Sequence, residues 1–171
     1  MDNPVVLLGG GAHGRVVIEA AQLAEIAVAG VVDPKLPPGT ALYGAPQLGE
    51  GVLTDDEALA RHRFHIALTD IATRRHLRAD LEGRGAVFAL ICHPRAIISP
   101  RARLGPGCFV AAGAIIGADA KLARGVIVNS GAQIDHDCSI GDDCHIAPGA
   151  VLAGGVRIGA EHGLTKPRRV H

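Results

Sequence analysis

The chain has 171 residues, of which 48% are hydrophobic, only 2% are aromatic and 23 are glycine. Seventeen basic residues balance seventeen acidic ones without a long run of either sign, so the sequence offers no electrostatic footprint for nucleic acid or for an anionic lipid surface. No apolar stretch is close to the length of about 18 residues that a membrane span needs. The N-terminus lacks the charged segment followed by an apolar segment that is typical of a signal peptide. We therefore expect a cytoplasmic protein with no nucleic-acid partner and no membrane partner.

The first 93 residues alternate the patterns of strands and helices. Apolar runs predict strands and periodic segments predict helices, over 4–8, 28–32, 65–68 and 86–91 for the strands and 15–26 and 72–81 for the helices. The segment 34–51 is rich in proline and glycine, which predicts a loop. Strands that alternate with helices indicate a small, Rossmann-like parallel α/β domain, and His93 and Pro94 mark its expected end.

A glycine-rich loop follows the first predicted strand. Gly9, Gly11 and Gly14 satisfy the G-x-G-x-x-G pattern directly before a helix, and Asp33 ends the next strand. This arrangement aims backbone N–H groups at a phosphate and offers a carboxylate to a ribose hydroxyl. A dinucleotide-binding dehydrogenase is one interpretation, but four strands lack the second mononucleotide half, so a nucleoside diphosphate fits better than NAD. A tight turn without a ligand stays open, and His13 either contacts a phosphate or is a solvated loop residue.

A six-residue repeat governs the second half of the chain. Ile, Leu or Val recurs at every sixth position from residue 98 to residue 158, and small or medium apolar residues recur at every sixth position from 102 to 156. Together these ladders predict a parallel β-helix with three short faces, about 18 residues per coil and an aliphatic core. Glycines just after the aliphatic positions are expected to permit the tight corners: Gly105, Gly117, Gly141 and Gly159.

The four cysteines show neither a CxxC pair nor the spacing of metal ligands. Cys108, Cys138 and Cys144 lie on the ladder of small residues, and Cys92 precedes it. We interpret them as free thiols in a reducing compartment, with the three ladder cysteines as inert core residues.

Polar residues that the repeat does not require gather between positions 129 and 145. His136 lies two positions after an inward isoleucine and His145 one position before another, so both are expected to project outward near coil corners. Asp135 and Asp137 flank His136, and a neighbouring carboxylate orients an imidazole and raises its basicity, as a general base requires. An exposed polar corner without a catalytic role is the alternative that spacing alone leaves open.

Five motifs carry a resemblance that covers nearly the whole chain. They are V-L-L-G-G-G-A-H-G near the N-terminus, G-V-V-D after the first helix, I-A-L-T-D-I-A-T-R in the middle, H-P-R-A-I-I-S-P at the junction and V-N-S-G-A-Q-I-D-H-D-C-S-I-G-D-D-C-H-I-A-P-G-A in the coils. On these motifs, of which the last is the most specific, the chain resembles the hexapeptide-repeat sugar acetyltransferases related to sialic acid O-acetyltransferases and bacillosamine-pathway N-acetyltransferases. The resemblance implies a left-handed β-helix, a homotrimer and active sites in the clefts between neighbouring subunits.

The resemblance also implies an activity, namely transfer of acetyl from acetyl-CoA to the amino group of a nucleotide-linked sugar without a metal. By matching motifs, His136 is similar to the general base and Asp137 to the carboxylate that tunes it. The same match implies contacts to acetyl-CoA by His145 near the thioester, by Asn129 in the lining of the active site and by Gly154 on the pantetheine path. The nucleotide sugar is expected on the α/β domain, near Gly11, His13, Gly14, Asp33 and Arg74.

We predict three segments, namely a nucleotide-sugar-binding α/β domain over 1–93, a left-handed β-helix acyltransferase domain over 94–160 and an atypical tail over 161–171. The tail breaks the ladder of small residues at His162 and Arg168, although Leu164 and Val170 keep the aliphatic register. Because members of the family continue through further coils, the tail resembles the product of a frameshift or an early stop.

Three hypotheses on the function follow. The first is an N-acetyltransferase that acts on a nucleotide-activated amino sugar. The second is an acetyltransferase of the same fold that acts on a sugar hydroxyl. The third is a shortened chain that binds a nucleotide sugar and assembles without transferring acetyl. No motif identifies the sugar or the nucleotide base.

Overall fold

The structure is a computed structural model that describes residues 3–164 and 169–170. The chain divides into two compact units, 1–89 and 90–171. None of the helices in the described part of the chain combines the length and the hydrophobicity that crossing a bilayer requires.

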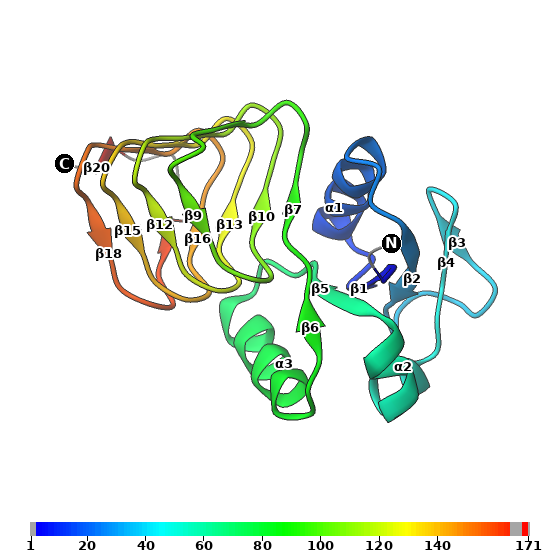
Figure 1. Cartoon of the computed structure of the whole chain (residues 1–171). Helices are drawn as coiled ribbons and strands as arrows, with labels where there is room; N and C mark the ends of the chain where they lie inside the picture. The colour runs from blue at the N-terminus through cyan, green and yellow to red at the C-terminus, as the bar shows by residue number, and fades with distance from the viewer. Residues whose placement is uncertain (1–2, 165–168, 171) are drawn as a thin grey trace. The chain divides into compact units, whose positions relative to one another are not determined.

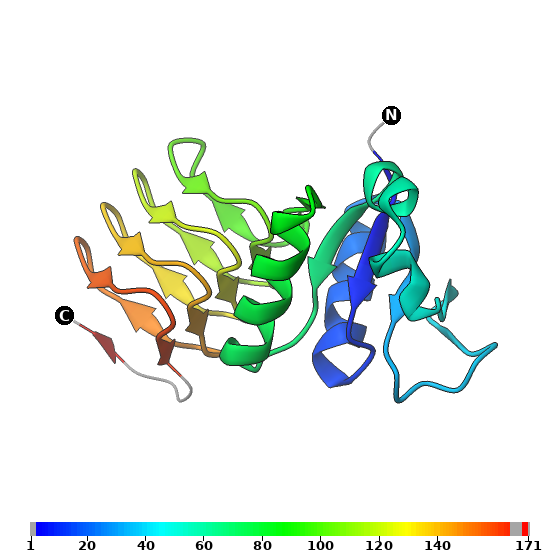
Figure 2. The ribbon, with the colours of Figure 1, turned by 90° about the horizontal axis from the view of Figure 1, so that it is seen from below.

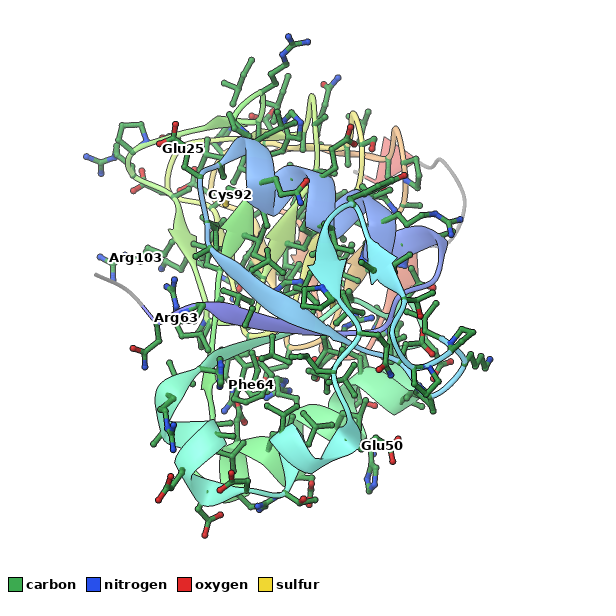
Figure 3. The ribbon with its side chains drawn as sticks, turned by 90° about the vertical axis from the view of Figure 1, so that its right-hand side faces the viewer. Glu25, Glu50, Arg63, Phe64, Cys92 and Arg103 are labelled. Atoms are coloured by element: carbon green, nitrogen blue, oxygen red, sulfur yellow. The ribbon has the colours of Figure 1, made fainter. Side chains whose placement is uncertain are left out.

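The first unit is built on four parallel strands in the order β2-β1-β5-β6 (Figure 1). These strands are β1 (Val5–Leu8), β2 (Val28–Val32), β5 (Arg63–Ile66) and β6 (Val87–Phe88). Helix α1 (Ala12–Leu23) connects β1 to β2, and helix α3 (Ile71–Gly83) connects β5 to β6. Phe64 of β5 is fully buried in the aliphatic core of this unit (Figure 3). The predicted parallel α/β sheet is therefore confirmed.

The segment between β2 and β5 is more ordered than the loop that its composition predicts. Strands β3 (Ala41–Leu42) and β4 (Ala45–Pro46) pair antiparallel, because Tyr43 and Gly44 both adopt positive φ angles, 48° and 83°, as a two-residue hairpin turn requires. The 3₁₀ helix η1 (Glu50–Leu53) and helix α2 (Asp56–Arg61) follow. The prediction of a loop over the whole of 34–51 was wrong at β3, β4 and the start of η1, since elements of two to four residues are too short to leave a periodic signal.

The second unit is a left-handed parallel β-helix whose coils lie side by side (Figure 2). Partner residues lie 18 positions apart, as in the pairs Ile97↔Ile115 and Ile127↔His145. Sheet 1 contains β7 (Ile91–Cys92), β10 (Phe109–Val110), β13 (Ile127–Val128), β16 (His145–Ile146) and β19 (Gly163–Leu164). Sheet 2 contains β8 (Ile97–Ile98), β11 (Ile115–Ile116), β14 (Gln133–Ile134), β17 (Val151–Leu152) and β20 (Arg169–Val170). Sheet 3 contains β9 (Arg103–Leu104), β12 (Lys121–Leu122), β15 (Ser139–Ile140) and β18 (Arg157–Ile158).

Both predicted ladders form the core of the β-helix. Every ladder residue from Cys108 to Leu152 is at most 4% exposed. The thiol of Cys108 donates a hydrogen bond to the backbone oxygen of Ala123 at 2.9 Å, and burial raises its pKa to about 12. This burial supports the interpretation of the ladder cysteines as core thiols, because the reactive form of cysteine is the thiolate.

The corners of the coil differ in one detail from the prediction. A residue with a positive φ recurs at every sixth position from 107 to 161, and it is glycine, aspartate or glutamate. The predicted corner glycines lie two positions earlier and have another reason to be glycine. A Cβ atom on Gly105 would lie 2.8 Å from the backbone of Ala123, and one on Gly141 would lie 2.4 Å from the backbone of Ala160. These glycines permit the close approach of the next coil, whereas the left-handed residue makes the turn.

Part of the predicted atypical tail lies among the described residues. The backbone of β19 pairs with β16 and that of β20 pairs with β17, each in the 18-residue register. The aliphatic positions 164 and 170 thus fall where the ladder predicts them. Arg168, where the ladder of small residues was expected to fail a second time, lies outside the described residues, as do 165–167 and 171.

Candidate functional site

His136 and Asp137 form a hydrogen-bonded pair on the outside of the β-helix. The pair lies on the corner between β14 of sheet 2 and β15 of sheet 3. Nδ1 of His136 lies 2.8 Å from Oδ2 of Asp137, and both side chains are exposed. Because a carboxylate only accepts, the neutral imidazole donates from Nδ1 and keeps the lone pair of Nε2 for a proton. The pair therefore has the arrangement of a histidine base with an orienting carboxylate.

The backbone of this corner fixes the pair. Asp137 adopts a φ of 58°, a conformation that aspartate tolerates, and the backbone N–H of His136 donates to Oδ1 of Asp135 at 2.7 Å. The hydrogen bond to Asp137, followed by the charge of Asp135, raises the pKa of His136 above its usual range. A raised pKa means that the neutral imidazole binds a proton more strongly, which makes it a stronger base.

Gly154 holds the position that is equivalent to His136 one coil later. A Cβ atom on Gly154 would lie 2.5 Å from Nε2 and 2.6 Å from Cε1 of His136. Position 118, one coil earlier, carries alanine, so the coil itself accepts a side chain there. Gly154 is therefore glycine because the imidazole of His136 lies over it. The motif match implies only a place on the pantetheine path for Gly154.

Asn129 and His145 form a second polar pair in the β-helix. Nδ2 of Asn129 lies 3.2 Å from Nε2 of His145, and Oδ1 of Asn129 accepts a hydrogen bond from the backbone N–H of Ser130 at 2.8 Å. Since Oδ1 is the acceptor, the amide of Asn129 donates to Nε2, and the neutral ring of His145 carries its proton on Nδ1. The structure thus brings these two predicted residues together.

The two polar pairs occupy different sides of the coil. His145 belongs to β16, and Asn129 follows β13, so this pair lies on sheet 1. His136 lies on the corner between sheets 2 and 3, and in a three-sided coil this corner is opposite sheet 1. A single chain therefore does not bring His136 and His145 to one place.

In the glycine loop of the first unit, the fold requires some of the glycines but not all of them. Gly9 has a φ of 107°, and a Cβ atom on Gly14 would lie 2.2 Å from the backbone oxygen of Gly9. The chain itself thus requires these two glycines, as a tight turn would. Gly11 differs, because a Cβ atom there would meet nothing within 4 Å. Gly11 also caps α1, whose first turn has neither a side-chain cap nor an acidic residue.

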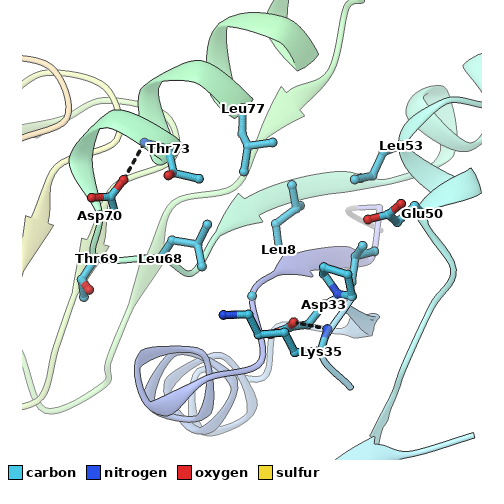
Figure 4. A pocket seen from close by; sticks show the side chains of 13 residues that line it. Leu8, Asp33, Lys35, Glu50, Leu53, Leu68, Thr69, Asp70, Thr73 and Leu77 are labelled. Carbon is cyan, nitrogen blue, oxygen red and sulfur yellow. Dashed lines mark hydrogen bonds between the residues drawn. The ribbon is translucent and has the colours of Figure 1, made fainter. Parts of the chain in front are cut away.

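A cavity of about 500 Å³ lies beside this loop (Figure 4). Leu8 and Gly9 at the end of β1, Asp33 after β2 and the segment 68–70 after β5 line it. The carboxyl ends of β1 and β5, where the strand order reverses, are where ligands bind in open parallel sheets. Oδ2 of Asp33 accepts from the backbone N–H of Gly10 at 2.8 Å, and Oδ1 accepts from that of Lys35 at 2.9 Å. Asp33 is thereby fixed at the rim of the cavity.

Four of the residues predicted to bind the nucleotide sugar do not line this cavity, namely Gly11, His13, Gly14 and Arg74. Arg74 is only 2% exposed, and its Nη1 donates to the backbone oxygens of Leu68 at 3.0 Å and Thr69 at 3.3 Å. Arg74 therefore holds the loop after β5, which carries part of the lining.

Sequence reasoning missed the polar lining that this loop and the loop after β2 supply. Lys35, Thr69, Asp70 and Thr73 all line the cavity. A signal for one of them was present, because an aspartate just before a predicted helix is typical of an N-cap. Oδ1 of Asp70 accepts from the backbone N–H of Thr73 at 2.8 Å (Figure 4).

Two family models match the chain. The model of the PglD N-terminal domain matches residues 4–81, and the model of the bacterial transferase hexapeptide (six repeats) matches residues 119–154. No curated protein sequence matches the chain significantly.

Solved structures match over both units. The acetyltransferase domain of PglB from Neisseria gonorrhoeae FA1090 is 32% identical with a TM-score of 0.83, and the match covers 92% of this chain and 77% of that one. A mutant of perosamine N-acetyltransferase from Caulobacter crescentus, solved with CoA and GDP-perosamine, is 36% identical with a TM-score of 0.82, and the match covers 90% and 73%. WeeI from Acinetobacter baumannii AYE, at 17% identity and a TM-score of 0.55, shares the fold. The chain belongs to the family of hexapeptide-repeat sugar O-/N-acetyltransferases, and the protein is an acyltransferase.

Proposed function

We propose that this protein transfers the acetyl group of acetyl-CoA to the amino group of a nucleotide-linked sugar, with His136 as the general base. The observation that carries this proposal is the orientation of the imidazole. Nδ1 is held by Asp137 at 2.8 Å, and Nε2 lies over the backbone of Gly154 on an exposed corner. The chain that carries this base is similar to a perosamine N-acetyltransferase and to the acetyltransferase domain of PglB.

The chemistry follows from the protonation states. A sugar amine is largely an ammonium near neutral pH, and its nitrogen attacks only after it has lost a proton. Nε2 of His136 accepts this proton, and the nitrogen attacks the thioester carbonyl. The C–S bond then breaks, and the leaving thiolate takes up the second proton that the nitrogen loses, which releases CoA as the thiol. Asp137 stabilises the imidazolium that forms. General base catalysis of this kind contributes about 10²- to 10⁴-fold, and joint binding of both substrates contributes through proximity.

The donor contacts belong to the second polar pair. We propose that the ring of His145 contacts the thioester region of acetyl-CoA and that Asn129 holds this ring. Because this pair lies on sheet 1, opposite the corner of His136, the proposal requires a neighbouring copy of the chain to complete each site. A homotrimer with sites between neighbouring subunits meets this requirement.

The acceptor is proposed to bind with its nucleotide on the first unit. The cavity beside the glycine loop offers an apolar wall with Leu8, Leu68 and Leu77, which suits a nucleobase. Asp33 at its rim is available for a ribose hydroxyl, and the N-terminus of α1 at Gly11, which has no side-chain cap, is available for a phosphate. His13, Gly14 and Arg74 then contribute to the shape of this loop region. A relative that is 36% identical was solved with GDP-perosamine, which supports a nucleotide sugar as the ligand class.

The experiment is a CoA-release assay with acetyl-CoA and a panel of nucleotide-linked amino sugars, with hydroxyl analogues beside them. We expect turnover with an amino acceptor and a loss of about 10²-fold or more in His136→Ala. His76→Ala, an exposed histidine on α3, is the control and should retain full activity. Full turnover by His136→Ala would overturn the assignment of the base, and turnover with hydroxyl acceptors alone would favour O-acetylation.

A mixing experiment tests the shared site. His136→Ala and His145→Ala are expected to be inactive as separate homotrimers. When the two variants are unfolded and refolded together, some interfaces combine an intact His136 with an intact His145, and part of the activity should return. Mixed oligomers without any recovered activity would show that both histidines act within one chain.

A further inference from the structure

Sheet 3 of the β-helix carries a row of cations on its outer face. The outward positions of β9, β12, β15 and β18 are Arg103, Lys121, Ser139 and Arg157, and register pairing stacks them coil upon coil. All four residues are exposed, and Arg103 points away from the coil (Figure 3). Among the described residues, no hydrogen bond or ion pair involves the side chains of Arg103, Lys121 or Arg157.

The fold does not require these cations. The same outward position in sheet 2 carries Ile97, Ile115, Gln133 and Val151 in an identical backbone register. Neighbouring coils are about 4.8 Å apart, so Arg103 and Lys121 repel each other across one coil. An anion bound between these side chains would remove this repulsion.

The row lines a cavity that can receive such an anion. The cavity has a volume of about 500 Å³, and Ser139, with its short side chain, lies between Lys121 and Arg157. Two carboxylates also line it, but each is already engaged. Asp119 accepts from Nε of Arg101 at 3.1 Å, and Asp137 accepts from His136 at 2.8 Å. Three cations and one hydroxyl therefore remain for a ligand.

We propose that this cavity binds the phosphate groups of a substrate, with Arg103, Lys121 and Arg157 as charge-assisted donors and Ser139 as a neutral donor. This inference rests on the proposed function, because Asp137 lines the cavity and also holds the base. A substrate anchored there by its phosphates lies directly beside His136. Both the diphosphate of the nucleotide sugar and the phosphates of acetyl-CoA have the required chemistry.

The test is a triple variant, Arg103→Gln, Lys121→Gln and Arg157→Gln, in the full chain. Each glutamine keeps a polar side chain on an exposed position, so the coil should fold. An Arg95→Gln variant, which removes an exposed charge elsewhere on the β-helix, is the control. We measure kcat, KM for each substrate and the dependence of KM on ionic strength, together with the Kd of acetyl-CoA and of the nucleotide sugar by calorimetry.

We expect KM and Kd for one phosphorylated substrate to rise about tenfold or more, with kcat at saturation within about twofold and a weaker salt dependence. A rise for the nucleotide sugar assigns the site to the acceptor diphosphate, in place of the N-terminus of α1, and a rise for acetyl-CoA assigns it to the donor. Unchanged constants for both substrates overturn the proposal, as does a change in oligomeric state, which would make the row an interface between copies. If the wild type binds the substrate without turnover and the triple variant loses this binding, the phosphate site stands and the proposed function is wrong.

Discussion

The β-helix and the α/β unit differ in how far the surroundings of a residue repeat. In the β-helix each position recurs after 18 residues in the same backbone environment, so Ala118, His136 and Gly154 form one column of equivalents. A departure from the column then indicates function directly. In the α/β unit no two positions share their surroundings, and a glycine of the loop can serve the fold and a ligand at once. The roles of such residues must be separated by substitution.

The largest effect is expected in the repeated core. Ile134 is fully buried, whereas Ile115, outward in the same sheet, is 38% exposed. Ile134→Ala should lower the free energy of unfolding by about 2–5 kcal/mol, because it leaves a cavity between coils. Ile115→Ala is the control and should cost well under half as much. Chemical denaturation of both variants measures the difference, and equal losses would contradict an inward ladder.

Two aspartates in one column give the next comparison. Asp119 and Asp137 both adopt the left-handed corner conformation, with φ angles of 59° and 58°, but only Asp137 contacts a histidine. Asparagine tolerates this conformation equally well, so both Asn variants should fold. Asp137→Asn should lower kcat about ten- to a hundredfold, since it removes the carboxylate that orients the imidazole of His136 and raises its pKa.

The pH dependence of Asp137→Asn adds a second readout. The carboxylate raises the pKa of His136, so its loss should move the acidic limb of the pH–rate profile to lower pH. Asp119→Asn should leave the limb in place. A profile that is identical in wild type and Asp137→Asn would show that His136 is not the titrating base.

The core of the α/β unit contains a buried histidine, whereas the ladders of the β-helix consist of aliphatic residues, alanine and cysteine. His65 is fully buried, Nδ1 lies 3.0 Å from the backbone oxygen of Ala89, and burial lowers its pKa from 6.5 to about 4. The unfolded state therefore binds a proton between pH 6.5 and 4 that the folded state does not, so stability falls as the pH falls through this window. Between pH 7 and pH 5 the loss is about 2 kcal/mol.

Substitution isolates this contribution. His65→Gln lacks the titrating group, so its free energy of unfolding should depend less on pH over the same window, whatever its value at pH 7. Unfolding curves of both proteins at pH 7, 6 and 5 give the two slopes. Parallel slopes would place the acid sensitivity on other groups.

Gly154 provides a smaller and sharper test of the column. Gly154→Ala would place a methyl group 2.5 Å from Nε2 of His136, so the ring must turn away, and kcat should fall about tenfold. In a His136→Ala background the same substitution should cost nothing in stability, because position 118 already carries alanine. Chemical denaturation measures the free energy of unfolding in both backgrounds, and a loss that is equally large in both would mean that the backbone, not the imidazole, demands the glycine.

The repeated unit was also the part that the sequence predicts best. A strict period of six residues predicts the ladders, the register and the outward direction of His136. The contact of His136 with Asp137 could also be predicted, because the two residues are adjacent in the sequence. The hairpin at Tyr43 and Gly44 left no periodic signal. The polar lining of the α/β cavity could not be predicted as a group, because Lys35, Thr69 and Asp70 meet only when the loops after β2 and β5 come together.

The smallest effect separates fold from ligand in the glycine loop. Gly11→Ala meets open space at a φ of −70°, so the free energy of unfolding should stay within about 0.5 kcal/mol. If a phosphate approaches this backbone, the methyl group should weaken binding of the nucleotide sugar several-fold while the KM of acetyl-CoA stays unchanged. Gly14→Ala is the contrasting variant, because its Cβ atom collides with the backbone oxygen of Gly9 and should destabilise the unit with or without ligand. Affinity that survives in Gly11→Ala would reduce the loop to a tight turn, and the acceptor would then be held by the lining of the cavity alone.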